Sequence, residues 1–154
     1  MKIGIVILCV SLLAAGGCSS KPKHDSQLAL IKTTNPEPIE LKVRPDNKSI
    51  GARVKHEIDS IPEVYDAAVI EGKDEIIVAY KVKHSKRFRM KKIEKKINSR
   101  LEKEYPDENF IVSSDYKIFL EAIRLKEEME ADTISKKDAS KRFEEIKELQ
   151  MEQT

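Results

Sequence analysis

The feature that most constrains the fold is a pair of β-rich runs, residues 64–70 and 76–82, joined by residues 71–74, Glu-Gly-Lys-Asp. Two such runs on either side of a short turn that contains glycine are typical of an antiparallel β-hairpin. Alternate residues of the second run are apolar along its whole length. The other side of that run ends in Lys81 and Lys83, which predicts that this second face meets solvent towards the end of the strand.

Amphipathic helices are predicted on both sides of the hairpin. In residues 50–61 and 86–105, apolar side chains recur every three or four positions, which is the period of a helix with one buried face. Pro62 and Pro106 follow these segments. Proline lacks an N–H and disfavours helical dihedral angles in the residue before it, so each helix is expected to stop there.

A short strand over residues 109–113 and a helix capped by Ser114 complete the predicted domain. The element order is helix, strand, strand, helix, strand, helix, and a further helix begins near Ser135. We therefore predict an α+β fold, a small two-layer sandwich in which a three-stranded sheet carries helices on one face. The strand reached through the second helix can lie parallel to a hairpin strand.

The N-terminal residues predict export and a lipid anchor. Met1 and Lys2 precede an apolar stretch over residues 3–15, which fits a signal-peptide core and is short of the roughly 20 residues of a membrane span. Small residues then lead to Cys18, an arrangement that resembles a bacterial lipobox. Cleavage before Cys18 would make this cysteine the first residue, and its thiol would carry a diacylglyceryl group with fatty acids such as palmitate. Two acyl chains anchor a protein stably in a membrane, whereas one gives only marginal binding. The alternative is an uncleaved anchor over residues 3–20.

Composition divides the chain into four predicted parts. They are a signal peptide at 1–17, a lipidated N-terminus and flexible tether at 18–47, an α+β domain at 48–131, and a charged C-terminal helix at 132–154. The tether is polar and contains several prolines, so it cannot bury enough apolar surface to fold alone. The C-terminal helix has a thin apolar stripe, which predicts loose docking and leaves open whether it docks on its own domain or on another protein.

Two stretches carry a resemblance to a known family. Residues 54–82, VKHEIDSIPEVYDAAVIEGKDEIIVAYKV, and residues 109–125, NFIVSSDYKIFLEAIRL, resemble the YhcN/YlaJ sporulation lipoproteins of endospore-forming bacteria. The resemblance covers about residues 50–130 and the lipobox. It implies a membrane lipoprotein of the spore that acts in germination or outgrowth and has no known catalytic activity. The hairpin-centred domain is also similar to BON-type envelope modules, which bind partners or phospholipid.

Catalysis, metal and cofactor binding find no support in the sequence. His24, His56 and His84 are dispersed and do not stand at metal-ligand spacing from one another or from a cysteine. The motifs of zinc proteases, serine hydrolases and phosphate-binding loops do not occur. Once the signal peptide is removed, Gly51 and Gly72 are the glycines that remain, which are too few for a phosphate cradle. We therefore expect no enzyme activity, no catalytic residue, no metal and no cofactor.

Positive charge is concentrated in residues 81–96. This segment holds nine Lys or Arg and one acid, Glu94, whereas the whole chain has a formal net charge of only +2. Cations are unfavourable in the first turn of a helix, because the helix N-terminus carries partial positive charge. We therefore predict that six side chains face an anionic surface, either a lipid leaflet or a wall polymer: Lys83, Lys86, Arg87, Arg89, Lys91 and Lys92. The alternative is an ordinary solvated loop. Nucleic acid is not an expected partner, since Phe88 alone is too little for base stacking.

Together these observations predict a lipid-anchored, non-enzymatic structural or interaction module on the extracytoplasmic face of the cell membrane, with the spore membrane as its specific location. The expected partners are the membrane, through Cys18, and an envelope protein or anionic polymer. The edge of the hairpin and the basic segment are the expected contact surface. The alternative function is a BON-like module that binds phospholipid or wall polymer and is unrelated to sporulation.

Overall fold

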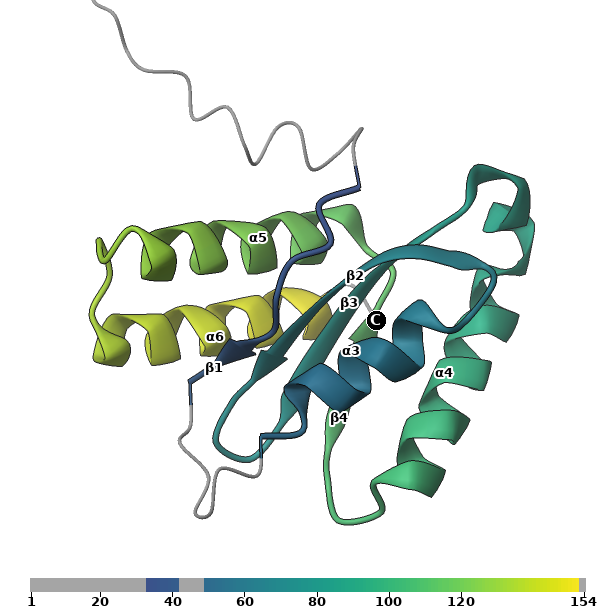
Figure 1. Cartoon of the computed structure of the whole chain (residues 1–154), viewed down its shortest axis with the longest axis horizontal. Coiled ribbons are helices and arrows are strands. Elements are labelled where there is room, and N and C mark those ends of the chain that lie inside the picture. The colour runs from purple at the N-terminus through teal and green to yellow at the C-terminus, as the bar shows by residue number, and fades with distance from the viewer. Residues whose placement is uncertain (1–32, 42–48, 153–154) are drawn as a thin grey trace, which may run out of the picture.

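A four-stranded sheet forms the centre of the computed structural model, which describes residues 33–41 and 49–152 (Figure 1). In the order of the sheet, the strands are β1 (Ile39–Glu40), β2 (Val64–Glu71), β3 (Ile76–Val82) and β4 (Phe110–Ser113). β2 and β3 are antiparallel, whereas β1 is parallel to β2 and β4 is parallel to β3. The predicted hairpin is confirmed and lies in the middle of the sheet, with a strand on each side of it.

Helices cover both faces of this sheet. They are α3 (Gly51–Asp59), the 3₁₀ helix η2 (His84–Arg89), α4 (Met90–Glu104), α5 (Tyr116–Glu130) and α6 (Lys136–Met151). α3 and α4 lie on one face, and α5 and α6 lie on the other (Figure 1). The α+β class is therefore confirmed. The predicted two-layer sandwich, with three strands and helices on one face, is wrong, because the sheet has four strands and forms the middle of three layers.

The reason lies in β3, whose seven residues are all buried. Val78 and Tyr80 belong to the cluster under α3 and α4, whereas Ile77 and Ala79 belong to the cluster under α5 and α6. Successive side chains of a strand point to opposite faces. A strand that is apolar on both faces needs a layer of helices on each side, and this is the arrangement observed.

The predicted helical stripes on the first face are confirmed. Ile58 of α3 and Ile97 of α4 are fully buried in one cluster with residues of β2, β3 and β4. The second predicted helix begins later than expected, since its first residues form η2 and the α-helix starts only at Met90. The predicted cap of α5 is also corrected. The carboxylate of Asp115, rather than the Ser114 hydroxyl, accepts hydrogen bonds from the first turn of this helix.

The C-terminal helix α6 docks on its own domain, which answers the question that the sequence left open. Its Phe143 is buried against the turn between β2 and β3. A Cβ atom placed on Gly72 would lie 2.5 Å from the Phe143 ring. Gly72 therefore leaves the space that the aromatic ring fills. A salt bridge between Arg142 and Glu121 joins α6 to α5 as well.

A buried ion pair connects β2 and β3. The Nζ atom of Lys81 lies 3.1 Å from Oδ2 of Asp66, and the two side chains are 1% and 0% exposed. The ammonium group also lies 4.7 Å from the ring centroid of Phe119 and 5.0 Å from that of Tyr65. The prediction that this face of β3 reaches solvent at Lys81 is therefore wrong, since a carboxylate neutralises the charge and two aromatic rings cover it.

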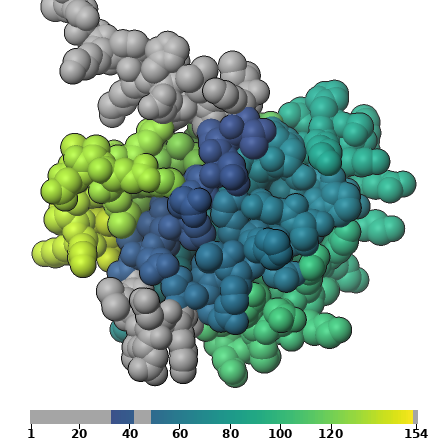
Figure 2. Space-filling view, in the orientation of Figure 1, coloured from purple at the N-terminus to yellow at the C-terminus, as the bar shows by residue number. Residues whose placement is uncertain are grey.

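The same carboxylate holds the N-terminal end of the described chain. Asp66 accepts hydrogen bonds from the Thr34 N–H at 2.8 Å, the Thr34 hydroxyl at 3.1 Å and the Asn35 N–H at 3.1 Å. Residues 33–41 then run beside β2, between the layers of helices (Figure 2). Residue 33 therefore lies at the end of the sheet where β2 begins and β3 finishes.

Replacing Asp66 with Asn should destabilise the protein strongly. The change removes the Asp66 carboxylate from the buried Lys81 ammonium, and breaking a buried pair in this way costs about 3–5 kcal/mol. Urea denaturation measures the free energy of unfolding. Asp107→Asn, at an exposed turn position, is the matched control and should change that energy by less than about 0.5 kcal/mol. Equal stability of the two variants would contradict the role of the pair.

Replacing Gly72 with Ala should also destabilise the protein, because the new methyl group would overlap the Phe143 ring. Overpacking of this kind costs about 1–3 kcal/mol. The smaller side chain in Phe143→Leu makes room for the methyl group. Thermal and urea denaturation should therefore show a smaller effect of Gly72→Ala in the Phe143→Leu background than in the native chain. The same cost in both backgrounds would show that the ring is not what requires glycine.

Candidate functional site

The predicted basic residues lie together at one end of the sheet. η2 follows β3 directly and leads into α4, and it projects from the domain at the upper right of Figure 1. We call residues 83–92 the basic tip. It contains all six cations named from the sequence: Lys83, Lys86, Arg87, Arg89, Lys91 and Lys92. No residue of η2 is buried, so this segment contributes nothing to the core.

One flank of the basic tip lies against the loop between α3 and β2. The Lys83 ammonium donates a hydrogen bond to the carbonyl oxygen of Pro62 at 2.6 Å. Arg89 and Lys92 line a hollow of about 450 Å³ together with Glu63. A backbone hydrogen bond and the Lys96 ammonium lower the pKa of Glu63 from its ordinary value. Glu63 is thus ionised and already paired with a cation outside the basic tip.

The other flank lies against the start of α5. The guanidinium group of Arg87 donates a hydrogen bond to the Tyr116 hydroxyl at 3.2 Å and lies 5.9 Å from the centroid of its ring. The Tyr116 and Tyr65 hydroxyls are 3.4 Å apart. This hydrogen bond lowers the pKa of Tyr116, whereas burial is the main cause that raises the pKa of Tyr65 to about 12. Arg87 therefore holds the basic tip to the body of the domain.

The six cations form no salt bridge with a carboxylate among the residues that the structure describes. Salt bridges within 33–41 and 49–152 involve other side chains of α3, α4, α5 and α6, together with the buried pair of the sheet. Lys86 is half-buried and the other five are exposed. The sequence therefore located a cluster of six cations that form no salt bridge in the part of the chain that the structure describes.

Phe88 is the residue of this surface that sequence reasoning missed. Its side chain is 101% exposed, and Met151 is the other large apolar side chain exposed within the described parts of the chain. From the sequence alone, Phe88 indicates only a single aromatic side chain, too little for base stacking. Its exposure could have been predicted from the sequence, because Phe88 lies between Arg87 and Arg89. It also lies outside the apolar stripe that begins with Met90 and Ile93.

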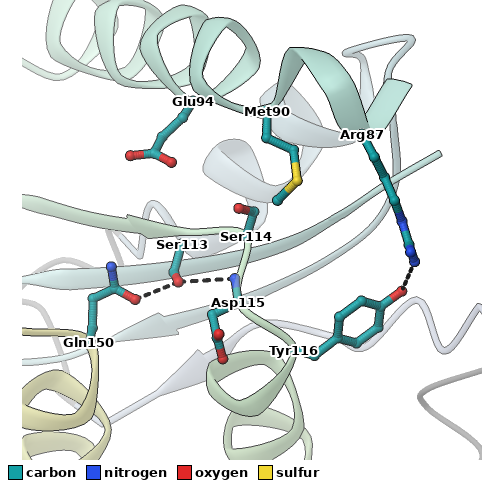
Figure 3. A pocket seen from close by; sticks show the side chains of 8 residues that line it. All are labelled: Arg87, Met90, Glu94, Ser113, Ser114, Asp115, Tyr116 and Gln150. Carbon is teal, nitrogen blue, oxygen red and sulfur yellow. Dashed lines mark hydrogen bonds between the residues drawn. The ribbon is translucent and has the colours of Figure 1, made fainter. Parts of the chain in front are cut away.

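A pocket of about 450 Å³ lies beside the basic tip (Figure 3), at the carboxyl ends of the parallel strands β3 and β4. Ligands often bind at such strand ends. Its lining comes from η2, α4, β4, the start of α5 and the end of α6: Arg87, Met90, Glu94, Ser113, Ser114, Asp115, Tyr116 and Gln150. The Ser113 hydroxyl donates to the Gln150 amide oxygen at 2.5 Å and accepts from the Asp115 N–H at 3.2 Å.

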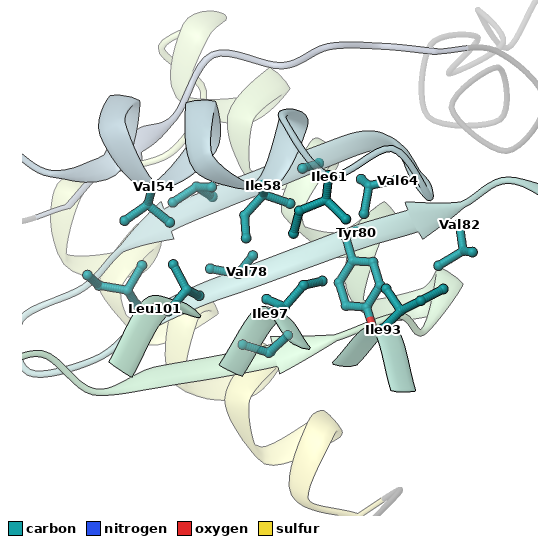
Figure 4. Packing of buried hydrophobic residues seen from close by; sticks show 14 of the residues in the cluster. Val54, Ile58, Ile61, Val64, Val78, Tyr80, Val82, Ile93, Ile97 and Leu101 are labelled. Atoms are coloured by element: carbon teal, nitrogen blue, oxygen red, sulfur yellow. The ribbon is translucent and has the colours of Figure 1, made fainter. Parts of the chain in front are cut away.

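This pocket provides polar groups without an arrangement for nucleophilic catalysis. The hydroxyl of Ser113 is bonded to an amide, which cannot take its proton as a base. Asp115 is engaged in capping α5. Tyr80 lies in the core close by, beside Ile93 (Figure 4), where burial raises its pKa to about 12.

Of the remaining predictions, those on metal binding and membrane spans concern described residues as well, whereas those on the signal peptide and Cys18 do not. Residues 33–41 and 49–152 include no group of three His, Cys, Asp or Glu side chains that could hold a metal ion. Within the same residues, no helix has the length and apolarity needed to cross a membrane. The predicted signal peptide and Cys18 lie outside the described residues.

The hairpin edge, which was predicted to make contacts, is partly paired within the chain. β1 pairs with the outer side of β2, and β4 pairs with the outer side of β3. Each edge of the hairpin is therefore paired over part of its length with a strand of the same chain, at residues 70–71 of β2 and 76–79 of β3. The strand predicted over residues 109–113, which can lie parallel to a hairpin strand, is β4 on β3. The sequence analysis did not include a strand at β1, which is only two residues long. Of the two surfaces predicted to make contacts, the basic tip carries no pairing strand, whereas part of the hairpin edge is paired within the chain.

Comparisons with known proteins agree with the resemblance seen in the sequence. Searches of curated proteins and of solved structures found no match. A family model described as sporulation lipoprotein YhcN/YlaJ matches residues 42–149. This range contains α3, β2, β3, η2, α4, β4 and α5, and most of α6. The chain therefore belongs to the YhcN/YlaJ family of sporulation lipoproteins.

Proposed function

We propose that this chain is a lipid-anchored, non-enzymatic module on the extracytoplasmic face of the cell membrane, specifically the spore membrane, and that its basic tip contacts an anionic surface. Cys18 carries the diacylglyceryl anchor, and residues 1–17 are the signal peptide that directs export. The module acts as a structural or interaction component in spore germination or outgrowth. Family membership supports the lipoprotein character of the chain and its link to sporulation.

The observation that carries this proposal is the set of six cations in the basic tip that form no salt bridge among the described residues. A fold gains nothing from collecting like charges in an unburied segment, because they repel one another and oppose the helix dipole of α4. A negatively charged bilayer attracts such residues at about 1 kcal/mol each. The basic tip therefore suits contact with anionic lipid, and an anionic wall polymer is the second source of the same charge.

Replacing Cys18 with Ala should abolish lipidation. In cells fed a labelled fatty acid, the native chain should carry the label and sediment with membranes. The Cys18→Ala chain should carry none, because no thiol remains for the diacylglyceryl group. Cys9→Ala is the matched control and should be labelled like the native chain, since it lies within the predicted signal peptide. Label on the Cys18→Ala chain would overturn the anchor.

Neutralising part of the basic tip should weaken binding to anionic vesicles. The test uses the mature chain from residue 18 with Cys18→Ser, so that no acyl chain contributes. Arg89, Lys91 and Lys92 are changed to Gln together, since no hydrogen bond or ion pair within the described chain depends on them. At about 1 kcal/mol per residue, affinity for phosphatidylglycerol vesicles should fall about tenfold to hundredfold.

The matched control changes the exposed residues Lys103, Lys136 and Lys137 to Gln and removes the same charge elsewhere. It should bind almost as the native chain does. Equal losses in the two triple variants would mean that net charge, rather than the basic tip, determines binding. Unchanged vesicle binding, with lost binding to purified anionic wall polymer, would assign the basic tip to the polymer.

A further inference from the structure

We propose that Phe88 inserts into the membrane, so that the basic tip forms a second membrane attachment beside the lipid anchor. The inference deepens the proposed function and rests on it, because it requires the domain to be held at an anionic bilayer. It adds an apolar contact to the electrostatic one and assigns an orientation to the domain, in which η2 faces the bilayer.

The first observation is the exposure of Phe88. Its side chain is 101% exposed, and the 3₁₀ helix that carries it has no buried residue. Scattered apolar side chains on a protein surface are ordinary, so exposure alone identifies nothing. Phe88, however, lies at the centre of an unburied projection, where neighbouring side chains of the domain cannot shield it from water. Only an apolar phase outside the protein, such as the acyl layer of a membrane, can shield the Phe88 ring from water.

The second observation is the arrangement of charge around this ring. Arg87 lies towards Tyr116 at the start of α5, whereas Arg89 and Lys92 line the hollow on the side of the α3–β2 loop. Cations therefore flank Phe88 on both sides. An aromatic ring among Lys and Arg suits the boundary between headgroups and acyl chains, because the ring enters the apolar layer while the cations remain at the anionic phosphates. This charge pattern favours an anionic bilayer over an uncharged apolar partner.

The third observation is where the tether joins the domain. Thr34 is hydrogen-bonded to Asp66, whose ion-pair partner Lys81 lies at the end of β3 from which the basic tip continues. In Figure 1 the segment 33–41 begins in the upper part of the domain, where η2 also lies. Residues 19–33 link Cys18 to this point and can span at most about 50 Å at roughly 3.3 Å per residue. A lipid on Cys18 therefore keeps this end of the sheet within about 50 Å of the bilayer.

The test uses Phe88→Trp in the lipidated chain. The native sequence contains no tryptophan, so the substitution introduces a single fluorophore. The chain is reconstituted in phosphatidylglycerol vesicles with and without lipids brominated in the upper acyl chain. Insertion predicts that the emission of the introduced tryptophan moves to shorter wavelength than in detergent-free buffer and is strongly quenched by the brominated lipid. It also predicts protection from acrylamide.

Asp107→Trp is the matched control, since Asp107 is exposed and precedes β4 at the opposite end of the sheet. Its emission should show no quenching by brominated lipid, although the same anchor holds the same chain. Equal quenching at the two positions would overturn the proposed orientation. Circular dichroism of both variants should match that of the native chain, which excludes misfolding as the source of a signal.

Different results would overturn the insertion of Phe88 and the lipid anchor on which the proposed function rests. If the Phe88→Trp chain remains on the vesicles through its acyl group while its emission is unshifted and unquenched, membrane insertion is overturned and the anchor stands. If the native chain isolated from cells carries no acyl group, the proposed function fails whatever the fluorophore reports. Protection of the Phe88→Trp emission by purified wall polymer, without quenching in vesicles, would overturn membrane insertion and assign the surface to the polymer.

Discussion

The buried pair of Asp66 and Lys81 is the interaction on which the rest of the structure depends. It joins the two central strands, places an ammonium group between the rings of Tyr65 and Phe119, and binds the start of the described chain through Thr34. Buried charges are costly unless each has a partner, so only one register of β2 against β3 is compatible with this pair. Its main effect is to specify how the strands, α5 and the N-terminal segment come together.

The position of the basic tip follows from this constraint. Lys81 is the last residue but one of β3, whose buried part ends at Val82, and the exposed cations begin at the next residue, Lys83. Because Asp66 also holds Thr34, the chain enters the domain at the end where the basic tip leaves it. The opposite end is closed by the β2–β3 turn, where Gly72 lies against Phe143. The domain therefore has one end suited to a charged surface and one end that is packed by its own helix.

Local sequence patterns predicted the helices and strands well, but they predicted less well how these pack into layers. The hairpin and the stripes of α3 and α4 follow from periodicity, which each segment carries by itself. The predicted number of layers was wrong because Lys81 was expected to face solvent. Only the three-dimensional structure shows that Asp66 lies opposite Lys81 and that both side chains are buried. Ile77 and Ala79 did indicate a second buried face, but what covers that face is a helix pair that follows much later in the chain.

The sequence by itself determined the hairpin, the amphipathic helices, the motif around Cys18 and the concentration of cations in residues 83–92, because each is a property of neighbouring residues. Tertiary structure alone decided that Lys81 is buried while Phe88 is exposed, and that α6 belongs to the domain. These outcomes depend on which side chains meet across separate elements. A lysine becomes a core residue where a carboxylate and two aromatic rings surround it, and a phenylalanine becomes a surface residue where its segment projects beyond every packing partner.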